Sequence, residues 1–239
     1  MNSRPKSDQQ HFDGLYPSMK FSRRDGKYRL NLSALALGLI AAGAVFTAPA
    51  RGQTIVDEWA SVKAPPPPEL KPVTIDPKIT ALLVLDPVRQ TCNMERRPRC
   101  IASIPKIQAL LSQARAKGVT VIYTHYTGTA AGDILKEVAP SAGEAVLGGT
   151  TGDKFIRTDL EKMLKDKGIK TVVTVGAAAE AAVLLTASAA AMRGIDVIVP
   201  VDGVSSSSIY AEQFTAWHLK NAATVGQRVT LTRTDLVGY

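Results

Sequence analysis

The segment that decides the fold reads KTVVTVGAAAEAAVLLTA and covers residues 170–187. Its residues 171–175 are all β-branched, which is typical of a buried strand, and a helix-like stretch follows Gly176. A strand, a glycine and a helix start form the corner where α/β proteins place ligands, because backbone N–H groups face the ligand there. Between Gly176 and Thr186, however, the sequence has no Ser, Cys, His or Lys, and its only ionisable side chain is Glu180. The position of this corner is typical of an active site, but its side chains are small and apolar, as in a packed core.

Strand-like and helix-like segments alternate on both sides of this corner. The order predicts an α/β fold, a three-layer Rossmann-like open parallel sheet with helices on both faces. Ligands then bind at the carboxyl ends of the strands, where Asp86, His125, Glu180 and Asp202 lie. We expect residues 127–152, rich in Gly, Ala and Thr, to be a long loop with a little helix. The expected strands are 79–85, 119–123, 171–175, 196–201 and 228–232, and the expected helices are 101–117, 159–167, 180–193 and 208–222.

The amino-terminal part of the chain has the pattern of an export signal. Of the formal net charge of +8, residues 1–52 contribute +5, from eight Lys or Arg and three Asp. An apolar run at 32–46 is too short for a typical membrane span, and small residues follow it. We therefore expect residues 1–52 to direct export to the periplasm or the exterior, with cleavage after Ala50 or Gly52. The pair Arg23-Arg24 loosely fits a twin-arginine signal. The alternative is an uncleaved anchor, which would be the chain's one contact with a membrane.

The rest of the chain divides into a linker and a domain. Four consecutive prolines at 65–68 indicate an extended Pro-rich linker over 53–69, followed by a domain at 70–239. No basic stripe with interleaved aromatic residues is present, so we expect no nucleic-acid partner. Ala-rich helices offer flat faces, so a homo-oligomer is possible.

The two cysteines lie close together, at Cys92 and Cys100. In an oxidising compartment such a pair predicts a disulfide. The alternative is that Cys92 is a reactive thiol whose pKa is lowered by the arginines between the two cysteines.

Four pieces of this sequence, taken in order, resemble the isochorismatase-like family of cysteine hydrolases. They are ALLVLD at 81–86, VTVIYTH at 119–125, Lys154-Phe155 with TDL at 158–160, and VVTVG at 172–176 continuing to VLLTA at 183–187. Each piece alone is a weak signal, but the order and spacing together are fairly specific for the fold.

The resemblance implies a covalent mechanism and locates its parts. In that family a Cys attacks the substrate carbon, an Asp takes the thiol proton, and a Lys holds both in place. By the match the Asp is Asp86 and the Lys is Lys154, but Glu180 replaces an Asp and Ala182 replaces the nucleophilic Cys. The resemblance therefore implies the family's strand–glycine–helix corner, but without the cysteine that its covalent chemistry needs. The expected pocket wall comprises His125, Ala178, Ala179 and Ala181.

Two functional hypotheses remain open from the sequence. The first is an exported hydrolase-fold protein that binds a small amide- or carbonyl-type ligand, or a protein partner, without covalent chemistry. The second is an active hydrolase of amide or related bonds that uses water activated by Asp86 or Glu180, or uses Cys92. We expect no cofactor and no metal, since the zinc sites of related amidohydrolases need an Asp and two His, and His125 lacks such companions. If the alignment is wrong, Asp86 and Lys154 will lie far apart.

Overall fold

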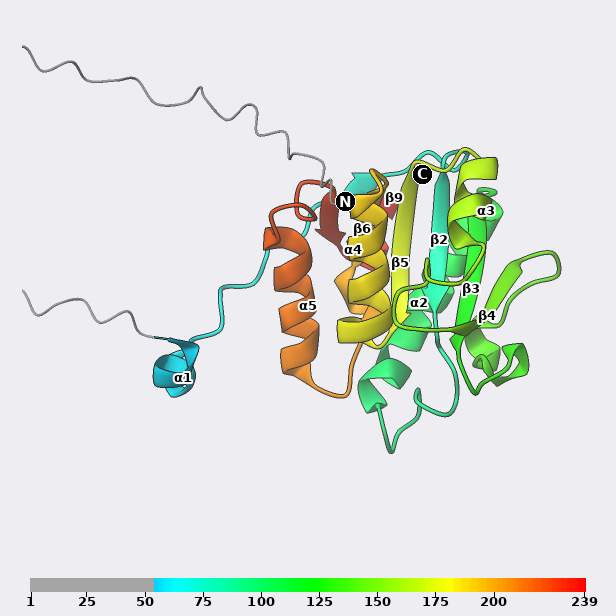
Figure 1. Cartoon of the computed structure of the whole chain (residues 1–239). Helices are drawn as coiled ribbons and strands as arrows, with labels where there is room; N and C mark the ends of the chain where they lie inside the picture. Colours follow the sequence, from blue (N-terminus) through cyan, green and yellow to red (C-terminus); the bar gives the residue numbers. More distant parts are fainter. Residues whose placement is uncertain (1–53) are drawn as a thin grey trace, which may run out of the picture. The chain divides into compact units, whose positions relative to one another are not determined.

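The computed structural model describes residues 54–239, so the export signal predicted at 1–52 lies outside the described residues. The chain divides into two units, Met1–Trp59 and Ala60–Tyr239. In the first unit, the described part contains the one-turn helix α1 (Ile55–Glu58). The second unit carries the sheet and the other helices (Figure 1). It starts ten residues before the predicted domain boundary at 70, which itself stays a prediction.

The second unit is built on a parallel sheet. Its strand order is β4-β3-β2-β5-β6-β8, with the short β7 paired to β5, and each of these pairings is parallel. Strands β1 (Val73–Thr74) and β9 (Val237–Gly238) form a separate parallel pair. The bounds of the main strands are β2 (Thr80–Leu85), β3 (Thr120–Tyr126), β4 (Ala145–Thr150), β5 (Thr171–Ala177), β6 (Asp196–Pro200), β7 (Val204–Ser205) and β8 (Val229–Thr232).

Helices cover both faces of this sheet, so the predicted three-layer α/β fold is confirmed (Figure 1). Leu82 and Val84 of β2 are buried with the apolar side chains of α2 (Pro98–Ala116). Leu83 and Leu85 point to the other face, because side chains alternate along a strand. There they join the cluster that contains side chains of α3 (Leu160–Asp166), α4 (Leu184–Met192) and α5 (Ile209–Asn221).

The strand order reverses between β2 and β5. From β2 the chain adds β3 and β4 on one side, and from β5 it adds β6 and β8 on the other. The carboxyl ends of two such neighbouring strands form the crevice in which open α/β sheets bind ligands. Leu85 is paired with Gly176 at this point, so the backbone leaves β2 and β5 side by side. The sheet therefore brings Asp86 and the corner after Gly176 together.

Gly176 is required at this corner for two reasons. Its φ is +120°, a region that L side chains rarely adopt. A Cβ at this position would lie 2.1 Å from the backbone oxygen of Leu85. The close approach of β2 and β5 thus depends on a residue without a side chain.

The prediction of loop over residues 127–152 was wrong in its last third. That part forms β4, which pairs with β3 at the edge of the sheet, and only the preceding residues contain the short 3₁₀ helices η2 (Ala131–Asp133) and η3 (Lys136–Val138). The two glycines of β4 gave no strand signal, since glycine is disfavoured in strands. Gly148 nevertheless has a packing reason, because a Cβ there would lie 2.5 Å from the His125 ring.

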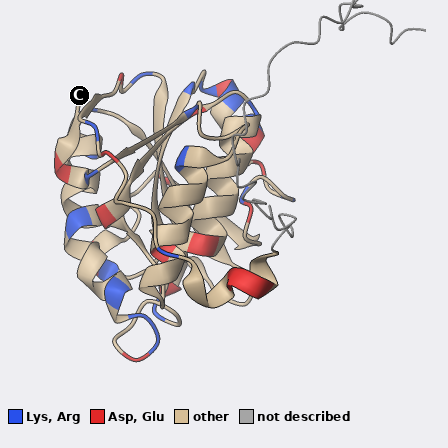
Figure 2. Cartoon of the chain, turned by 90° about the vertical axis from the view of Figure 1, so that its left-hand side faces the viewer, with Lys and Arg blue, Asp and Glu red and all other residues tan. Residues whose placement is uncertain are grey.

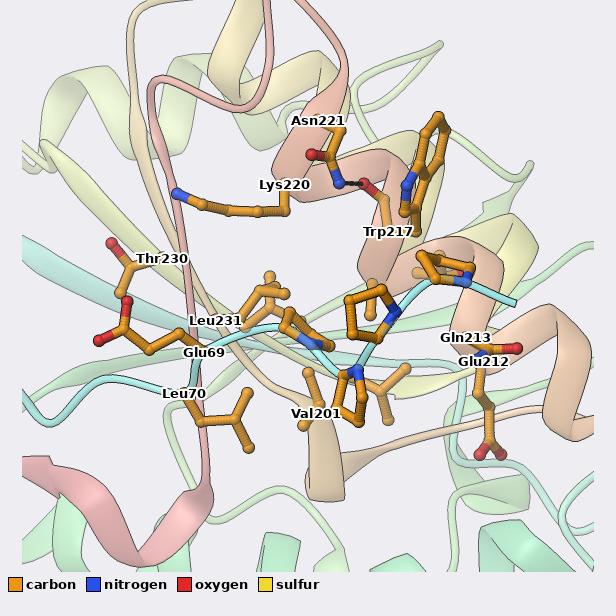
Figure 3. Close-up of a pocket in the computed structure, with 18 of the residues that line it drawn as sticks. Glu69, Leu70, Val201, Glu212, Gln213, Trp217, Lys220, Asn221, Thr230 and Leu231 are labelled. Carbon is orange, nitrogen blue, oxygen red and sulfur yellow. Dashed lines mark hydrogen bonds between the residues drawn. The ribbon is translucent and has the colours of Figure 1, made fainter. Parts of the chain in front are cut away.

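The Pro-rich segment lies beside a large apolar cavity of about 900 Å³. The four prolines line this cavity together with residues of α5, among them Trp217 and Lys220, which Figure 3 labels. The cavity lies at the β8 edge, and none of the site residues expected from the sequence lines it. Between residues 54 and 239, none of the helices has both the length and the apolar character needed to cross a membrane.

Candidate functional site

Asp86 is the first residue after β2 and carries the central carboxylate of the site. Its φ of +49° turns the chain sharply out of the sheet, and only 6% of the residue is exposed. The Thr124 hydroxyl of β3 donates a hydrogen bond of 2.6 Å to Oδ1. Oδ2 accepts a bond of 2.5 Å from Lys154 Nζ. Each oxygen thus has a partner, which is the requirement for keeping a carboxylate out of water.

Lys154 comes from the turn between β4 and α3 and is fully buried. Besides Asp86, its ammonium donates to Thr150 Oγ1 at 2.8 Å and to the Thr151 backbone oxygen at 2.6 Å. All three N–H donors are therefore used. Burial lowers the pKa of Lys154 from its ordinary value, and the Asp86 carboxylate opposes this effect. Asp86 and Lys154 meet as the match requires, so the reading in which they lie far apart is wrong.

Helix α4 helps to hold the backbone of Lys154. The Lys154 amide donates to Thr186 Oγ1 at 3.2 Å, and the Thr186 hydroxyl donates to the Gly152 backbone oxygen at 3.3 Å. The Thr158 hydroxyl donates to the Lys154 backbone oxygen. The lysine is thereby fixed from both sides before any ligand arrives, which is the geometry of a preorganised site.

The corner after β5 carries no nucleophile. The peptide bond between Ala177 and Ala178 is cis, and residues Ala179–Val183 form a π-helical turn, η4, that continues into α4. Ala182 lies in this turn with 3% of its surface exposed, in the same apolar cluster as Leu85 and Phe155. These two residues precede Asp86 and follow Lys154 in the sequence. Ala182 thus packs on the face of the sheet that carries Leu85 and Phe155.

The other predicted residues of the corner differ in exposure. Ala179 is fully buried, whereas Ala178 and Ala181 are half-buried and Glu180 is exposed. Glu180 interacts electrostatically with Arg97, which lies between the two cysteines. Ala179 belongs to the core, and the pocket role of Ala178 and Ala181 stays a prediction.

The His125 ring lies against Gly148, and His125 Nδ1 is 3.3 Å from Thr129 Oγ1. It is the backbone oxygen of His125 that is linked to the lysine, because it accepts a bond of 2.9 Å from Thr150 Oγ1. From the sequence, the His125 ring could either form a pocket wall or fill space as a hydrogen-bonded side chain. The geometry favours the second alternative.

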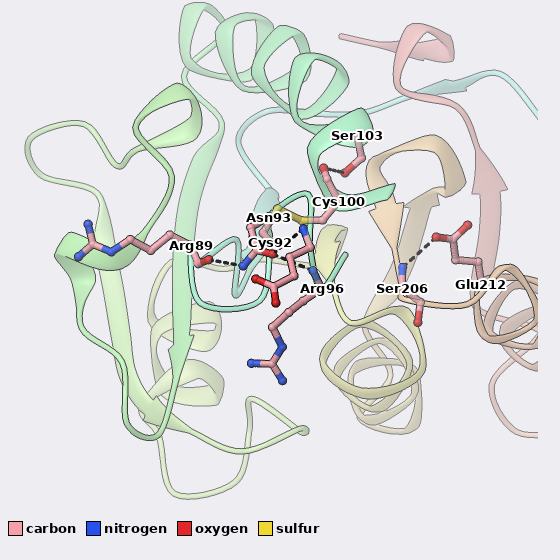
Figure 4. Close-up of a disulfide and its surroundings, with 9 residues drawn as sticks. Arg89, Cys92, Asn93, Arg96, Cys100, Ser103, Ser206 and Glu212 are labelled. Atoms are coloured by element: carbon pink, nitrogen blue, oxygen red, sulfur yellow. Dashed lines mark hydrogen bonds between the residues drawn. A yellow bond between two sulfur atoms is a disulfide. The ribbon is translucent and has the colours of Figure 1, made fainter. Parts of the chain in front are cut away.

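The predicted disulfide is present. Cys92 and Cys100 are bonded, with their Cα atoms 5.3 Å apart, and each is 1% exposed (Figure 4). The alternative of a reactive Cys92 is therefore wrong, because a bonded sulfur is neither a thiolate nor a nucleophile. Within residues 54–239, no three His, Cys, Asp or Glu side chains gather in a way that could hold a metal ion.

The hydroxyl groups around the ion pair are not among the residues predicted from the sequence. Thr124, Thr150 and Thr186 come from three different elements and each contacts Asp86 or Lys154. Thr124 directly precedes His125, and Thr186 belongs to the segment 170–187 itself. The available signal was that buried charges need additional hydrogen-bond partners.

Comparisons with known proteins agree with this geometry. A family described as "Isochorismatase domain" matches residues 80–233. A secreted isochorismatase effector of Verticillium dahliae is 36% identical over 118 residues, which cover 45% of this chain and 62% of that protein. A streptothricin hydrolase of Streptomyces noursei is 29% identical over 162 residues, covering 64% of this chain and 62% of the relative. The matches thus span less than two thirds of these relatives.

A solved structure shows the same fold. An isochorismatase family protein of Desulfovibrio vulgaris superposes with a TM-score of 0.60 at 19% sequence identity. The superposition covers 66% of this chain and 95% of that protein.

Proposed function

Because this chain belongs to the isochorismatase family, we propose that it is an exported hydrolase-fold protein that binds a small amide- or carbonyl-type ligand without covalent cysteine chemistry. The observation that carries this proposal is the contrast at the β2–β5 crevice. The Asp86–Lys154 pair is complete and hydrogen-bonded. The position that the match assigns to the nucleophile holds the methyl group of Ala182.

The missing sulfur excludes the family's covalent chemistry at this position. Alanine has no lone pair with which to attack a carbonyl carbon, so no thioester or related intermediate forms at this position. What remains is the Asp86 carboxylate, which the Lys154 ammonium holds in place, and the backbone N–H groups at the start of η4. Such groups position a carbonyl oxygen and an amide N–H by hydrogen bonds.

The test is a comparison of turnover on a panel of primary amides and aryl esters. The native protein is expected to show none, and Ala182→Cys is expected to gain activity that Asp86→Asn then removes. Ala190→Cys is the matched control, because Ala190 is also buried but lies further along α4. Turnover by the native protein that Asp86→Asn abolishes would instead establish the alternative, hydrolysis by water activated at Asp86 or Glu180.

Export is part of the proposal and has separate support. The disulfide between Cys92 and Cys100 is typical of oxidising compartments, the sequence has a signal-like pattern at 1–52, and one relative is named as a secreted effector. Producing the full chain in a bacterial host and measuring the mass of the exported form tests it. We expect the mature protein to start at Arg51 or Gln53. A chain that retains residues 1–52 in the cell would contradict export, and loss of export in Arg23→Lys with Arg24→Lys would identify the twin-arginine route.

A further inference from the structure

A second candidate site lies at the β8 edge of the sheet. The cavity there has a volume of about 900 Å³, which is within the range of small-molecule sites in proteins. Its lining comes from three parts of the chain, which are the proline strap (defined as residues 65–68), the helix α5 and the strands β6 and β8 (Figure 3). Neither Asp86 nor Lys154 lines it, so a ligand bound here is independent of the proposed function.

The proline strap leaves this space open because it cannot extend the sheet. β8 is the last strand on its side of the sheet, and an edge strand presents backbone groups with which a neighbouring segment can pair. Proline has no N–H, so the strap cannot donate to β8. Just after the strap, the Lys71 amide donates to the Leu231 backbone oxygen at 3.0 Å, and Leu70 packs against the apolar core. The strap is thereby anchored at one end, and the cavity beside it is retained.

The lining of the cavity is mostly apolar. Besides the prolines, it includes Val199, Val201 and Leu231 from the sheet and Trp217 from α5. Trp217 is 46% exposed, so a large aromatic surface is left in water that an apolar ligand would cover with a gain in free energy. The strap and α5 limit the shape of the occupant, because it must fit the space that both leave. A ring or an extended acyl chain does so more readily than a helix of about 10 Å diameter.

One charged group of the lining has no partner of opposite charge. Glu69 pairs with Lys71 at 3.3 Å, and the Glu212 carboxylate pairs with Arg99. Within residues 54–239, no carboxylate lies at ion-pair distance from the exposed ammonium of Lys220, which also lines the cavity. The lining therefore presents one positive charge that is not neutralised, and the complementary ligand carries one negative charge.

We propose that this cavity binds an amphipathic carboxylate, whose apolar body lies against Trp217 and the proline strap and whose carboxylate contacts Lys220. The apolar body supplies most of the affinity, in proportion to the surface that it removes from water. Lys220 is exposed, so its ion pair with the ligand adds little affinity and serves to orient the ligand. Both acyl chains and aryl acids have this chemistry.

Trp217 fluorescence reports directly on the cavity. The chain has two tryptophans, Trp59 and Trp217, so Trp59→Phe leaves Trp217 as the single indole. This variant is titrated with decanoate and with phenylbutyrate, which represent an acyl chain and an aryl acid. We expect a saturable change of Trp217 emission with at least one of them, and the tighter of the two identifies the kind of apolar body. Decanol and phenylbutanol are the uncharged counterparts.

Two further substitutions in the Trp59→Phe background test the two parts of the site. Lys220→Gln should weaken the carboxylates about two- to fivefold and leave the alcohols unchanged. Lys165→Gln is its control, because Lys165 is an exposed lysine of α3. Ala216→Leu fills part of the cavity and should weaken the carboxylates by about tenfold or more. Ala211→Leu is its control, since Ala211 is also a half-buried residue of α5 but does not line the cavity.

Several results would overturn the proposal. Trp217 emission that neither carboxylate changes, or binding that Ala216→Leu leaves intact, would show that the cavity is not the site. If Ala216→Leu does not fold, Lys220→Gln decides, and carboxylate affinities that it leaves unchanged contradict the assignment of the negative charge. A dimer in sedimentation velocity that Trp217→Ser dissociates and decanoate does not would instead assign this face to a second copy of the chain. None of these results affects the ligand proposed at Asp86, because the two sites share no residue.

Discussion

Lys154 Nζ lies 2.5 Å from Asp86 Oδ2, although the two residues are 68 positions apart in the sequence. Neither belongs to a regular element, since Asp86 follows β2 and Lys154 lies in the turn before α3. Their meeting is enforced by the parallel sheet and by three threonine hydroxyls. A buried ion pair of this kind often adds little net stability compared with apolar side chains, but removing one of its partners destabilises the fold strongly.

Removing one partner of this pair is expected to destabilise the protein strongly. Asp86→Asn leaves the Lys154 ammonium buried without a counter-charge and should lower the free energy of unfolding by about 3–5 kcal/mol. Urea denaturation at neutral pH measures this. The exposed pair Lys162–Asp166 is the control, and Asp166→Asn should change the free energy of unfolding far less, because water screens this pair. Equal costs at the two sites would show that the Asp86–Lys154 pair is not desolvated in solution.

A second prediction concerns the loss of stability in acid. Burial alone would raise the pKa of Glu144, but the Arg115 guanidinium and the Ser141 amide together lower it. A carboxylate whose folded pKa lies below its unfolded value stabilises the fold above the unfolded pKa, and this contribution is lost as the pH falls through the folded pKa. Glu144→Gln should therefore cost about 1–2 kcal/mol at pH 7.

The same variant should cost less and less as the pH falls through the folded pKa of Glu144, because the native carboxyl is protonated there. Denaturant titrations of both proteins over a series of pH values from neutral to acid check this. A cost that does not change with pH would show that the Arg115–Glu144 interaction is not linked to protonation.

The close approach of β2 and β5 gives a third prediction. Gly176→Ala introduces a Cβ 2.1 Å from the Leu85 backbone oxygen, so the two strands must separate at the site. We expect the free energy of unfolding to fall by more than about 3 kcal/mol, because the strain arises in the buried centre of the sheet. Gly118→Ala is the control, because Gly118 also has a positive φ but has no atom within 4 Å of the added Cβ, and it should cost only about 1–2 kcal/mol. Similar losses for the two variants would contradict the packing argument.

Thiol titration of the exported protein tests the disulfide. The bond between Cys92 and Cys100 predicts no free thiol without reductant and two after unfolding in reductant. Replacing both cysteines by serine should cost about 2–3 kcal/mol, because the closed loop is short. Two reactive thiols in the folded protein would contradict the bond.

The sequence predicts the sheet better than the details of the site. Buried parallel strands such as β2 and β5 are almost continuously apolar and are easy to identify, and the resemblance links Asp86 to Lys154. Strand β4 was not predicted, because Gly148 and Gly149 interrupt the apolar pattern of a strand. The cavity at the β8 edge was not predictable either, because the proline strap, α5 and β8 are brought together only by the fold.

By the sequence match, Ala182 holds the place of the attacking cysteine that an Asp86–Lys154 pair serves. The most direct measurement is the intact mass of Ala182→Cys after exposure to activated aryl esters. We predict one acyl adduct, located at position 182 by peptide mapping, that Asp86→Asn suppresses and that Ala190→Cys does not form. An Ala182→Cys protein that stays unmodified, or one acylated no faster than Ala190→Cys, would contradict the claim.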